Sequence, residues 1–274
     1  MFRTNRLTDE HRKSVQNEQE SGGGLLIVNA DDWGQDATIT NRTLDCVRRG
    51  SVTAVSAMVF MKDSERAAAL ALDRKIDAGL HLNFTTPFSA SKIPSRLAEY
   101  LDKVAAFLRA HRLAQVMYHP GLTTAFEFLV ASQIEEFRRL YGSTPLRLDG
   151  HHHMHLCANV RLQRLLPPST LVRRSFSFRR GEKALLNRLY RKHVDAVLSR
   201  RHRLTDYFFS LAPLSATDRI VQLFELAQTS VVEVEVHPIV PGEYTFLLAP
   251  EFQRLTAGVN VGPHNTADLK KLVE

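Results

Sequence analysis

The chain has 274 residues, of which 44% are hydrophobic and 24% charged, and its formal net charge at pH 7 is +7. These values are ordinary for a soluble globular protein with one large α/β domain. No apolar run approaches the roughly 18 residues that cross a bilayer, which excludes a membrane-spanning protein. The two cysteines, Cys46 and Cys157, are too few for a disulfide framework, and we expect a cytoplasmic protein.

Residues 1 to 24 are predicted to form a flexible polar tail. This segment carries charges of both signs, lacks the apolar stretch of a secretory signal, and ends in one serine and three glycines. Folding is expected to start at Leu25. Residues 25 to 274 are predicted to form a single domain, because no long linker rich in proline, glycine or serine divides them.

Short apolar runs alternate with helical patterns along this domain. The predicted strands are 25 to 30, 52 to 60, 76 to 83, 146 to 150, 171 to 178, 206 to 211, 231 to 237 and a weaker 259 to 261. The clearest helices are 37 to 49, followed by Gly50 as a stop signal, and 124 to 140. Such alternation predicts a parallel sheet in an α/β fold, either a closed or distorted (β/α) barrel or an open doubly wound sheet. The glycine-rich fingerprints of nucleotide-binding folds are missing.

Basic residues gather between positions 161 and 203, where Glu182 and Asp195 are opposed by many arginines and lysines. A solvated helix surface is the simplest interpretation of this stretch. Peripheral contact with an anionic substrate, a lipid headgroup or a polyanion is the alternative. We expect no nucleic acid partner, because the stretch matches none of the common recognition modules and has few stacking aromatics.

Four predicted strands end in residues that bind metals or transfer protons. In chain order these are Asp31 and Asp32, then His81, then His151, His152, His153 and His155, and finally His237. Alone, an Asp pair is more often a turn or helix cap, and a single histidine is more often a core residue. In parallel α/β folds, however, the active site lies at the carboxyl ends of the strands. The joint placement therefore favours a metal site.

The ligand chemistry agrees with a catalytic role. One carboxylate and two imidazoles leave coordination positions open for water and substrate. Adjacent aspartates cannot both point the same way at a strand end, so one can bind the metal while the other accepts a proton from the attacking water. A histidine from the opposite side of the barrel is suited to protonating a leaving amine.

Four segments carry a resemblance to a known family: "LLIVNADDWG", "AGLHLNF", "RLDGHHHMH" and "VEVEVHP". In this order and spacing they resemble the YdjC-like carbohydrate deacetylases, which include chitooligosaccharide and hopanoid-biosynthesis deacetylases. The resemblance covers about residues 25 to 258. It implies a (β/α) barrel of the glycoside hydrolase and deacetylase type. It also implies removal of an acetyl group from an N-acetylated amino sugar with a divalent ion, usually Mg²⁺, with Zn²⁺ or another divalent ion as alternatives.

Carried over by motif position, the resemblance implies that Asp32, His81 and His151 bind the metal and that Asp31 is the catalytic base. His237 matches the family's histidine before proline, and we infer for it an acid or oxyanion-stabilising role. The loops after Asn83 and after Pro238 differ from the family pattern, which leaves the sugar unassigned.

The other three histidines of the run are expected to differ in role. His153 is placed near the metal as a support or substrate contact, whereas His152 and His155 are expected to be structural. Extended backbone would project alternate side chains to one side, and a turn after Gly150 would break this alternation.

Two further functions were weighed. A glycosidase needs two carboxyl groups on either side of a sugar, but Glu233, Glu235 and Glu243 lie on one strand or just past it. A noncatalytic polyanion-binding protein would use the basic stretch and leave the histidines without a role. The expected partner is therefore an N-acetylated sugar, and the oligomeric state stays open, with a homodimer among the options.

Overall fold

A computed structural model describes residues 23–110, 113–178, 182–215 and 217–264. Most of the predicted tail, residues 1–22, lies outside the described residues, as do 179–181 of the basic stretch and 265–274 of the predicted domain. Within these ranges, no helix has the length and apolar character needed to cross a bilayer.

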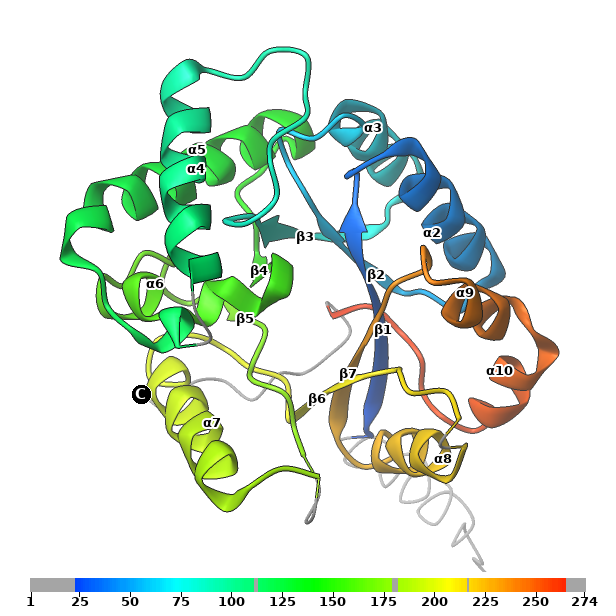
Figure 1. Ribbon diagram of the computed structural model, residues 1–274. Helices are drawn as coiled ribbons and strands as arrows, with labels where there is room; N and C mark the ends of the chain where they lie inside the picture. The colour runs from blue at the N-terminus through cyan, green and yellow to red at the C-terminus, as the bar shows by residue number, and fades with distance from the viewer. Residues whose placement is uncertain (1–22, 111–112, 179–181, 216, 265–274) are drawn as a thin grey trace, which may run out of the picture.

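One sheet of seven parallel strands organises the molecule, in the order β5-β4-β3-β2-β1-β7-β6. The strands are β1 (Leu25–Trp33), β2 (Ala54–Ala57), β3 (Asp77–Leu82), β4 (Arg147–Gly150), β5 (Leu171–Val172), β6 (Tyr207–Ser210) and β7 (Val231–Val236). Figure 1 shows the sheet inside a ring of helices. The predicted α/β fold with a parallel sheet is confirmed.

The barrel is distorted at the seam between β5 and β6. In the described part of the chain these strands share no continuous ladder, and separate backbone hydrogen bonds link their neighbourhoods. Val172 N donates to Arg203 O at 2.9 Å, Arg203 N to Thr170 O at 3.0 Å, and Ser177 N to Phe208 O at 2.8 Å. The prediction of a distorted (β/α) barrel is therefore confirmed.

The helices of the outer layer follow the strands along the chain. They are α2 (Ala37–Arg49), α3 (Ser64–Arg74), α4 (Ser95–Ala110), α5 (Thr123–Tyr141), α6 (Ala158–Leu162), α7 (Leu185–Leu198), α8 (Thr217–Leu226), α9 (Pro241–Leu248) and α10 (Pro250–Leu255), with the 3-10 segments η1 (Ala114–Val116), η2 (Pro120–Leu122) and η3 (His151–Leu156). The Asp36 side chain caps α2, and Gly50 ends it with a left-handed φ of 77°, at the stop that the sequence predicted.

The main core lies between the sheet and the helices. All nine residues of β1 are buried, because the strand is central in the sheet and covered on both faces. Leu26, Trp33 and Phe84 are among its largest fully buried side chains. Burying a side chain of this size contributes about 1.5 to 3 kcal/mol, so the core fixes the strands whose ends form the site.

Three predicted strands are shorter than expected by three residues or more, or are reduced to a single bridge. The segment 52 to 60 forms a strand only over Ala54–Ala57, and 171 to 178 only over Leu171–Val172. After Val172 the chain leaves the ladder, and the side chain of Arg173 turns into the interior, where it pairs with acidic residues. The weak strand at 259 to 261 is reduced to one bridge between Leu26 and Val261.

Candidate active site

Asp31 and Asp32 lie inside β1, which runs three residues beyond its predicted end. The β1–β2 ladder shifts register between Ala30 and Trp33, and Asp32 has a left-handed φ of 64°. A bulge of this kind bends a strand and redirects its side chains. The two adjacent carboxylates consequently reach different partners, although both are buried.

Asp32 meets two histidines from neighbouring regions of the sheet. Its Oδ1 lies 2.8 Å from His151 Nδ1 and 3.4 Å from His81 Nε2. The ligand atoms of the three residues all lie within 4.8 Å of one another. A carboxylate oxygen and two imidazole nitrogens this close form a donor set that fits one divalent ion.

A second carboxylate orients His81. Asp149 Oδ1 lies 2.8 Å from His81 Nδ1, and both side chains are almost fully buried. This contact holds the ring so that Nε2 faces Asp32, an arrangement that commonly supports a metal-binding histidine. Asp149 was missed from the sequence. The register of the parallel strands β3 and β4 could have revealed this contact, since it places His81 directly beside Asp149.

Charge coupling sets the protonation of these residues. Burial by itself lowers the pKa of His81, but the nearby carboxylates of Asp31 and Asp149 outweigh it and raise the value to about 10. Burial opposes ionisation of Asp32, yet hydrogen bonds from His151 and His81 hold its pKa well below the usual range. At neutral pH a protonated His81 therefore faces an ionised Asp32, and a bound cation would displace that proton.

Asp31 turns toward Arg173 instead. Arg173 Nη1 and Nη2 donate to its two carboxylate oxygens at 2.7 and 2.8 Å, and the Asn29 side chain donates to it at 2.8 Å. Arg173 also pairs with Glu233 at 2.7 Å and Asp149 at 2.9 Å. Burial by itself lowers the pKa of Arg173, but the three carboxylates outweigh this effect and raise the pKa well above its ordinary value. Arg173 is thus a permanent buried cation that compensates the negative charge of its carboxylate partners.

The histidine run forms the turn η3, and it is not an extended segment. His152 and His153 both have left-handed φ values, 54° and 56°. His151 reaches Asp32, whereas His152 Nδ1 lies 3.0 Å from the Thr85 hydroxyl. The turn therefore gives the two rings different polar partners although their centroids are only 3.9 Å apart, and it breaks the alternation of an extended strand, as expected for a turn after Gly150.

His153 and His155 have other partners than His151 and His152. His153 Nε2 lies 3.5 Å from Glu235 Oε2, and its ring packs against Phe176 with centroids 4.6 Å apart. His155 is completely buried, and its Nε2 lies 2.9 Å from the backbone oxygen of Arg173. Burial lowers the pKa of His155 to about 4, so its ring is neutral at physiological pH.

All five residues singled out from the sequence line one cavity of about 350 Å³. Its described lining consists of Asp31, Asp32, His81, His151, His152, His153, Glu235 and His237. His237 follows β7 and is half-buried, and its backbone N–H donates to Glu243 Oε2 at 2.7 Å. The topology therefore brings together side chains from the ends of β1, β3, β4 and β7.

Glu235 is a member of this cavity that sequence reasoning did not place there. Burial and the charge of Asp31 raise its pKa well above the usual value. A raised pKa favours the protonated carboxyl group, which can donate a hydrogen bond. Its position on β7, two residues before His237, was the available signal.

A second hollow of about 310 Å³ extends the cavity along its rim. It shares His152 and His153 with the first and continues to Phe176, Asn187 and Tyr190. The Phe176 ring is stacked on Phe208 with centroids 4.6 Å apart, which fixes an aromatic surface here. Together the two hollows offer space for a ligand larger than one reacting group.

Comparison with known proteins supports a common origin for these motifs. A family model described as "YdjC-like protein" matches residues 25–257. Relatives include a carbohydrate deacetylase of Mus musculus, 31% identical over 137 residues (49% of this chain, 44% of the relative). The carbohydrate deacetylase of Geobacillus stearothermophilus is 30% identical over 138 residues (49% and 51%). The chitooligosaccharide deacetylase of Proteus mirabilis is 32% identical over 142 residues (50% and 52%). The chain spans about half the length of these curated relatives.

A solved structure shares the fold. It comes from Enterococcus faecalis V583 and is described, provisionally, as a cellobiose-phosphate cleavage protein. It matches with a TM-score of 0.61 and 18% identity, and the match covers 89% of this chain and 98% of the other. At this identity the likeness bears on the fold alone.

Proposed function

Because the chain belongs to the YdjC-like protein family, we propose that it is a carbohydrate N-deacetylase, a hydrolase that removes the acetyl group from an N-acetylated amino sugar. The relatives named as deacetylases support this activity. The observation that carries the proposal is the convergence of Asp31, Asp32, His81, His151 and His237 on one cavity.

Asp32, His81 and His151 would hold a divalent ion, which the family pattern suggests is Mg²⁺, with Zn²⁺ as the alternative. The close approach of their ligand atoms and the support that Asp149 gives His81 favour this role. When bound, such an ion polarises the acetyl carbonyl and lowers the pKa of the attacking water.

Asp31 would act as the general base. Its carboxylate lines the cavity, and Arg173 and Asn29 fix its orientation. It accepts a proton from the water whose oxygen attacks the acetyl carbonyl carbon. The carbon–nitrogen bond then breaks, acetate leaves, and the sugar nitrogen takes up a proton to become an amine.

His237 would supply that proton or stabilise the oxyanion, because it lines the same cavity and follows β7, whereas Asp31 lies on β1. Glu235 would be a second donor, since its raised pKa favours the protonated form and it lines the cavity too. The rest of the sugar would extend into the hollow bounded by Phe176 and Tyr190. This hollow can accommodate an oligosaccharide, a glycolipid or another glycoconjugate.

The proposal includes a cytoplasmic location. Cys46 and Cys157 are both buried free thiols, which agrees with a compartment that keeps cysteines reduced.

Acetate release from a panel of N-acetylated sugars tests the function. Metal-stripped protein is reloaded with Mg²⁺ or Zn²⁺, and Asp31→Asn serves as the control for contaminating activity. Acetate production without new reducing ends supports deacetylation. New reducing ends without acetate would assign a glycosidase instead, and protein that stays inactive on every sugar after reloading with either ion would favour a binding protein.

A further inference from the structure

The outer face of α7 is apolar although it faces solvent. Leu186 is 81% exposed, Leu189 52% and Val197 37%. Val194 and Leu198, which lie along one side of this exposed row, are buried against the protein. Single exposed leucines are common, but a row of them on one helix face marks a surface that contacts another apolar phase.

Further exposed apolar side chains enlarge this face. Leu185 is 66% exposed and Tyr190 39%, and Leu162 on α6 is 65% exposed. Arg161 Nη2 donates to the Tyr190 hydroxyl at 3.2 Å, which ties the end of α6 to α7. We call Leu162, Leu185, Leu186, Leu189, Tyr190 and Val197 the α7 apolar face.

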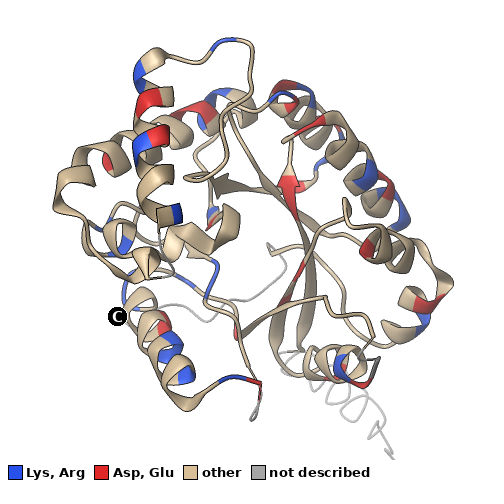
Figure 2. Ribbon diagram, viewed as in Figure 1, with Lys and Arg blue, Asp and Glu red and all other residues tan. Residues whose placement is uncertain are grey.

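Positive charge surrounds the α7 apolar face. Arg188, Arg191 and Lys192 lie on the same helix, and Figure 2 shows basic residues along it. The acidic residue of α7, Asp195, is buried and pairs with Arg174 at 2.9 Å. Most of the positive charge of this surface is therefore not compensated within the protein and is available to a partner.

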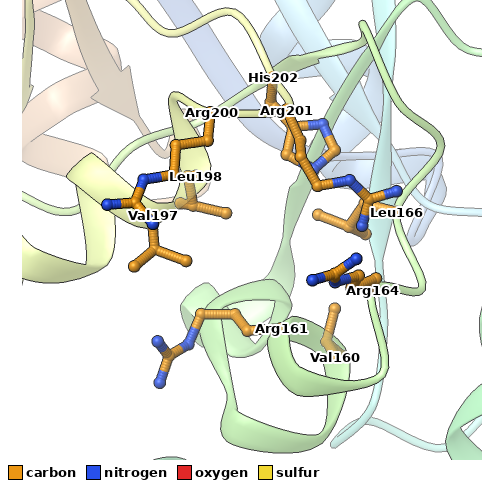
Figure 3. Close-up of a pocket in the computed structure, with 9 residues that line it drawn as sticks. All are labelled: Val160, Arg161, Arg164, Leu166, Val197, Leu198, Arg200, Arg201 and His202. Carbon is orange, nitrogen blue, oxygen red and sulfur yellow. The ribbon is translucent and has the colours of Figure 1, made fainter.

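A cavity of about 280 Å³ lies at the end of α7, and we call it the arginine pocket. Its described lining is Val160, Arg161, Arg164, Leu166, Val197, Leu198, Arg200, Arg201 and His202. Figure 3 shows Arg164 and Arg201 on one side of the hollow and Arg161 and Arg200 on the other. None of these lining residues is acidic.

The arginine pocket lacks internal compensation for its charge. Arg164, Arg200 and Arg201 form no ion pair with any residue in the described ranges. Guanidinium groups bind phosphate oxygens through paired, charge-assisted hydrogen bonds. Several of them around a hollow with valine and leucine walls suit a phosphate group that carries an organic substituent.

The two features are joined, because Val197 belongs both to the α7 apolar face and to the arginine pocket. An exposed apolar stripe beside unpaired cations is the pattern of helices that lie in the interface of an anionic bilayer. A second copy of this chain is a poorer partner, since symmetric pairing would bring the same cations face to face.

We propose that α7 docks this protein onto an anionic phospholipid bilayer, with a lipid phosphate in the arginine pocket and the α7 apolar face at the acyl boundary. This docking does not rest on the proposed deacetylase function, although Tyr190 borders both the docking surface and the hollow assigned to the sugar. It is a binding property that metal-free protein should show equally.

Sedimentation with vesicles tests the docking. We expect partition onto vesicles of phosphatidylcholine mixed with phosphatidylglycerol to exceed partition onto phosphatidylcholine alone by about tenfold or more, and to fall as salt is raised. Equal partition onto both vesicles would overturn the proposal. Soluble glycerol 3-phosphate is the second arm. If it stabilises the protein against heat while the vesicles fail to bind, the pocket takes a soluble phosphate ester and the membrane assignment is wrong.

Matched variants locate the contact. Arg164→Glu/Arg201→Glu should reduce partition at least tenfold, whereas Arg48→Glu/Arg138→Glu changes net charge equally on other helices and should reduce it much less. An equal loss in both pairs would overturn the arginine pocket as the phosphate site.

Leucine variants test the apolar contact. Leu186→Glu/Leu189→Glu should also reduce partition, while Leu72→Glu on α3, which alters a leucine that is 55% exposed, should not. Circular dichroism and thermal melting show whether each variant is folded. Unchanged partition of a folded Leu186→Glu/Leu189→Glu protein would overturn the docking of the α7 apolar face.

Discussion

Arg173 donates one hydrogen bond to each carboxylate oxygen of Asp31, at 2.7 and 2.8 Å, in the interior of the protein. The same guanidinium lies 2.9 Å from Asp149, which in turn orients His81. One buried cation therefore connects the candidate base with a candidate metal ligand. The orientations of Asp31 and His81 therefore depend on the planar, forked guanidinium group of Arg173.

Arg173→Lys should lower turnover about 10- to 100-fold while bound metal is retained, the usual scale for losing a supporting contact. Lysine keeps the charge but cannot make two parallel hydrogen bonds to Asp31. Acetate release and elemental analysis measure the two effects. Wild-type turnover in this variant would show that the forked contact is dispensable.

Asp31→Asn should retain metal and lose roughly 10²-fold or more in turnover, because the amide cannot accept the proton of the attacking water. The substitution keeps the size of the side chain. Single-turnover acetate release is the measurement, with metal content determined on the same sample. Near-normal turnover would exclude Asp31 as the base.

Asp32→Ala, His81→Ala and His151→Ala should each reduce both bound metal and activity, because each removes one of three protein ligands. His152→Ala and His155→Ala are the controls and should retain metal. His155→Ala is also expected to lower the thermal midpoint, since the ring is completely buried. Full metal occupancy in the first three variants would place the ion elsewhere.

Metal binding should release a proton from His81. Its pKa of about 10 lies above the ordinary value of 6.5, so the metal-free imidazole is protonated at neutral pH and must lose that proton to bind an ion. Apparent affinity should therefore rise with pH up to about that value. Calorimetry in buffers of different ionisation enthalpy detects the proton, and identical binding enthalpies would contradict this coupling.

Replacing Glu233 or Glu235 with glutamine should change the free energy of unfolding in opposite directions as the pH rises above about 4.5. Arg173 overcomes burial and lowers the pKa of Glu233 to about 2, from an ordinary value of 4.5. Its ionised form therefore stabilises the fold above pH 4.5, and this contribution is lost as the pH falls toward 2. Glu233→Gln should lower the free energy of unfolding at pH 7 by up to about 3 kcal/mol.

Glu235 has a raised pKa, mainly through burial. In the folded protein Glu235 binds its proton more tightly than it does in the unfolded chain. Its contribution to stability is therefore largest below the pKa that it has in the unfolded chain, and it declines as the pH rises through the higher pKa of the folded protein. Glu235→Gln should gain stability relative to wild type as the pH rises above about 4.5. Thermal melts of both glutamine variants between pH 4.5 and 7.5 make the comparison, and parallel losses would refute it.

The sequence predicted that Asp31, Asp32, His81, His151 and His237 would lie together, because parallel strands deliver their carboxyl ends to one side of a sheet. It could not predict the environment of Arg173, since its partner Asp31 is 142 positions away in the chain. An arginine within a basic stretch resembles a surface residue until the fold buries it. The bulge at Asp32 was equally hidden, because a local register shift depends on the neighbouring strand.

The fold was predicted best where periodicity and end signals agree. Residues 37 to 49 combine a helical pattern with Gly50 as a stop signal, and α2 has those bounds. The segment 171 to 178 has strand-forming residues, but it leaves the ladder after Val172. Tertiary pairing of Arg173 outweighs local strand propensity there.

The left-handed backbone at His152 and His153 limits which sequences a mutant library can sample at this turn. Glycine, asparagine and aspartate adopt such angles readily, whereas valine, isoleucine and threonine are strained there by about 1 to 3 kcal/mol each. Many random substitutions at these two positions would therefore destabilise the turn, and such variants would be lost before any effect on catalysis could be selected. A library built to alter sugar preference gains more from varying Phe176 or Tyr190, whose side chains border the hollow without this constraint.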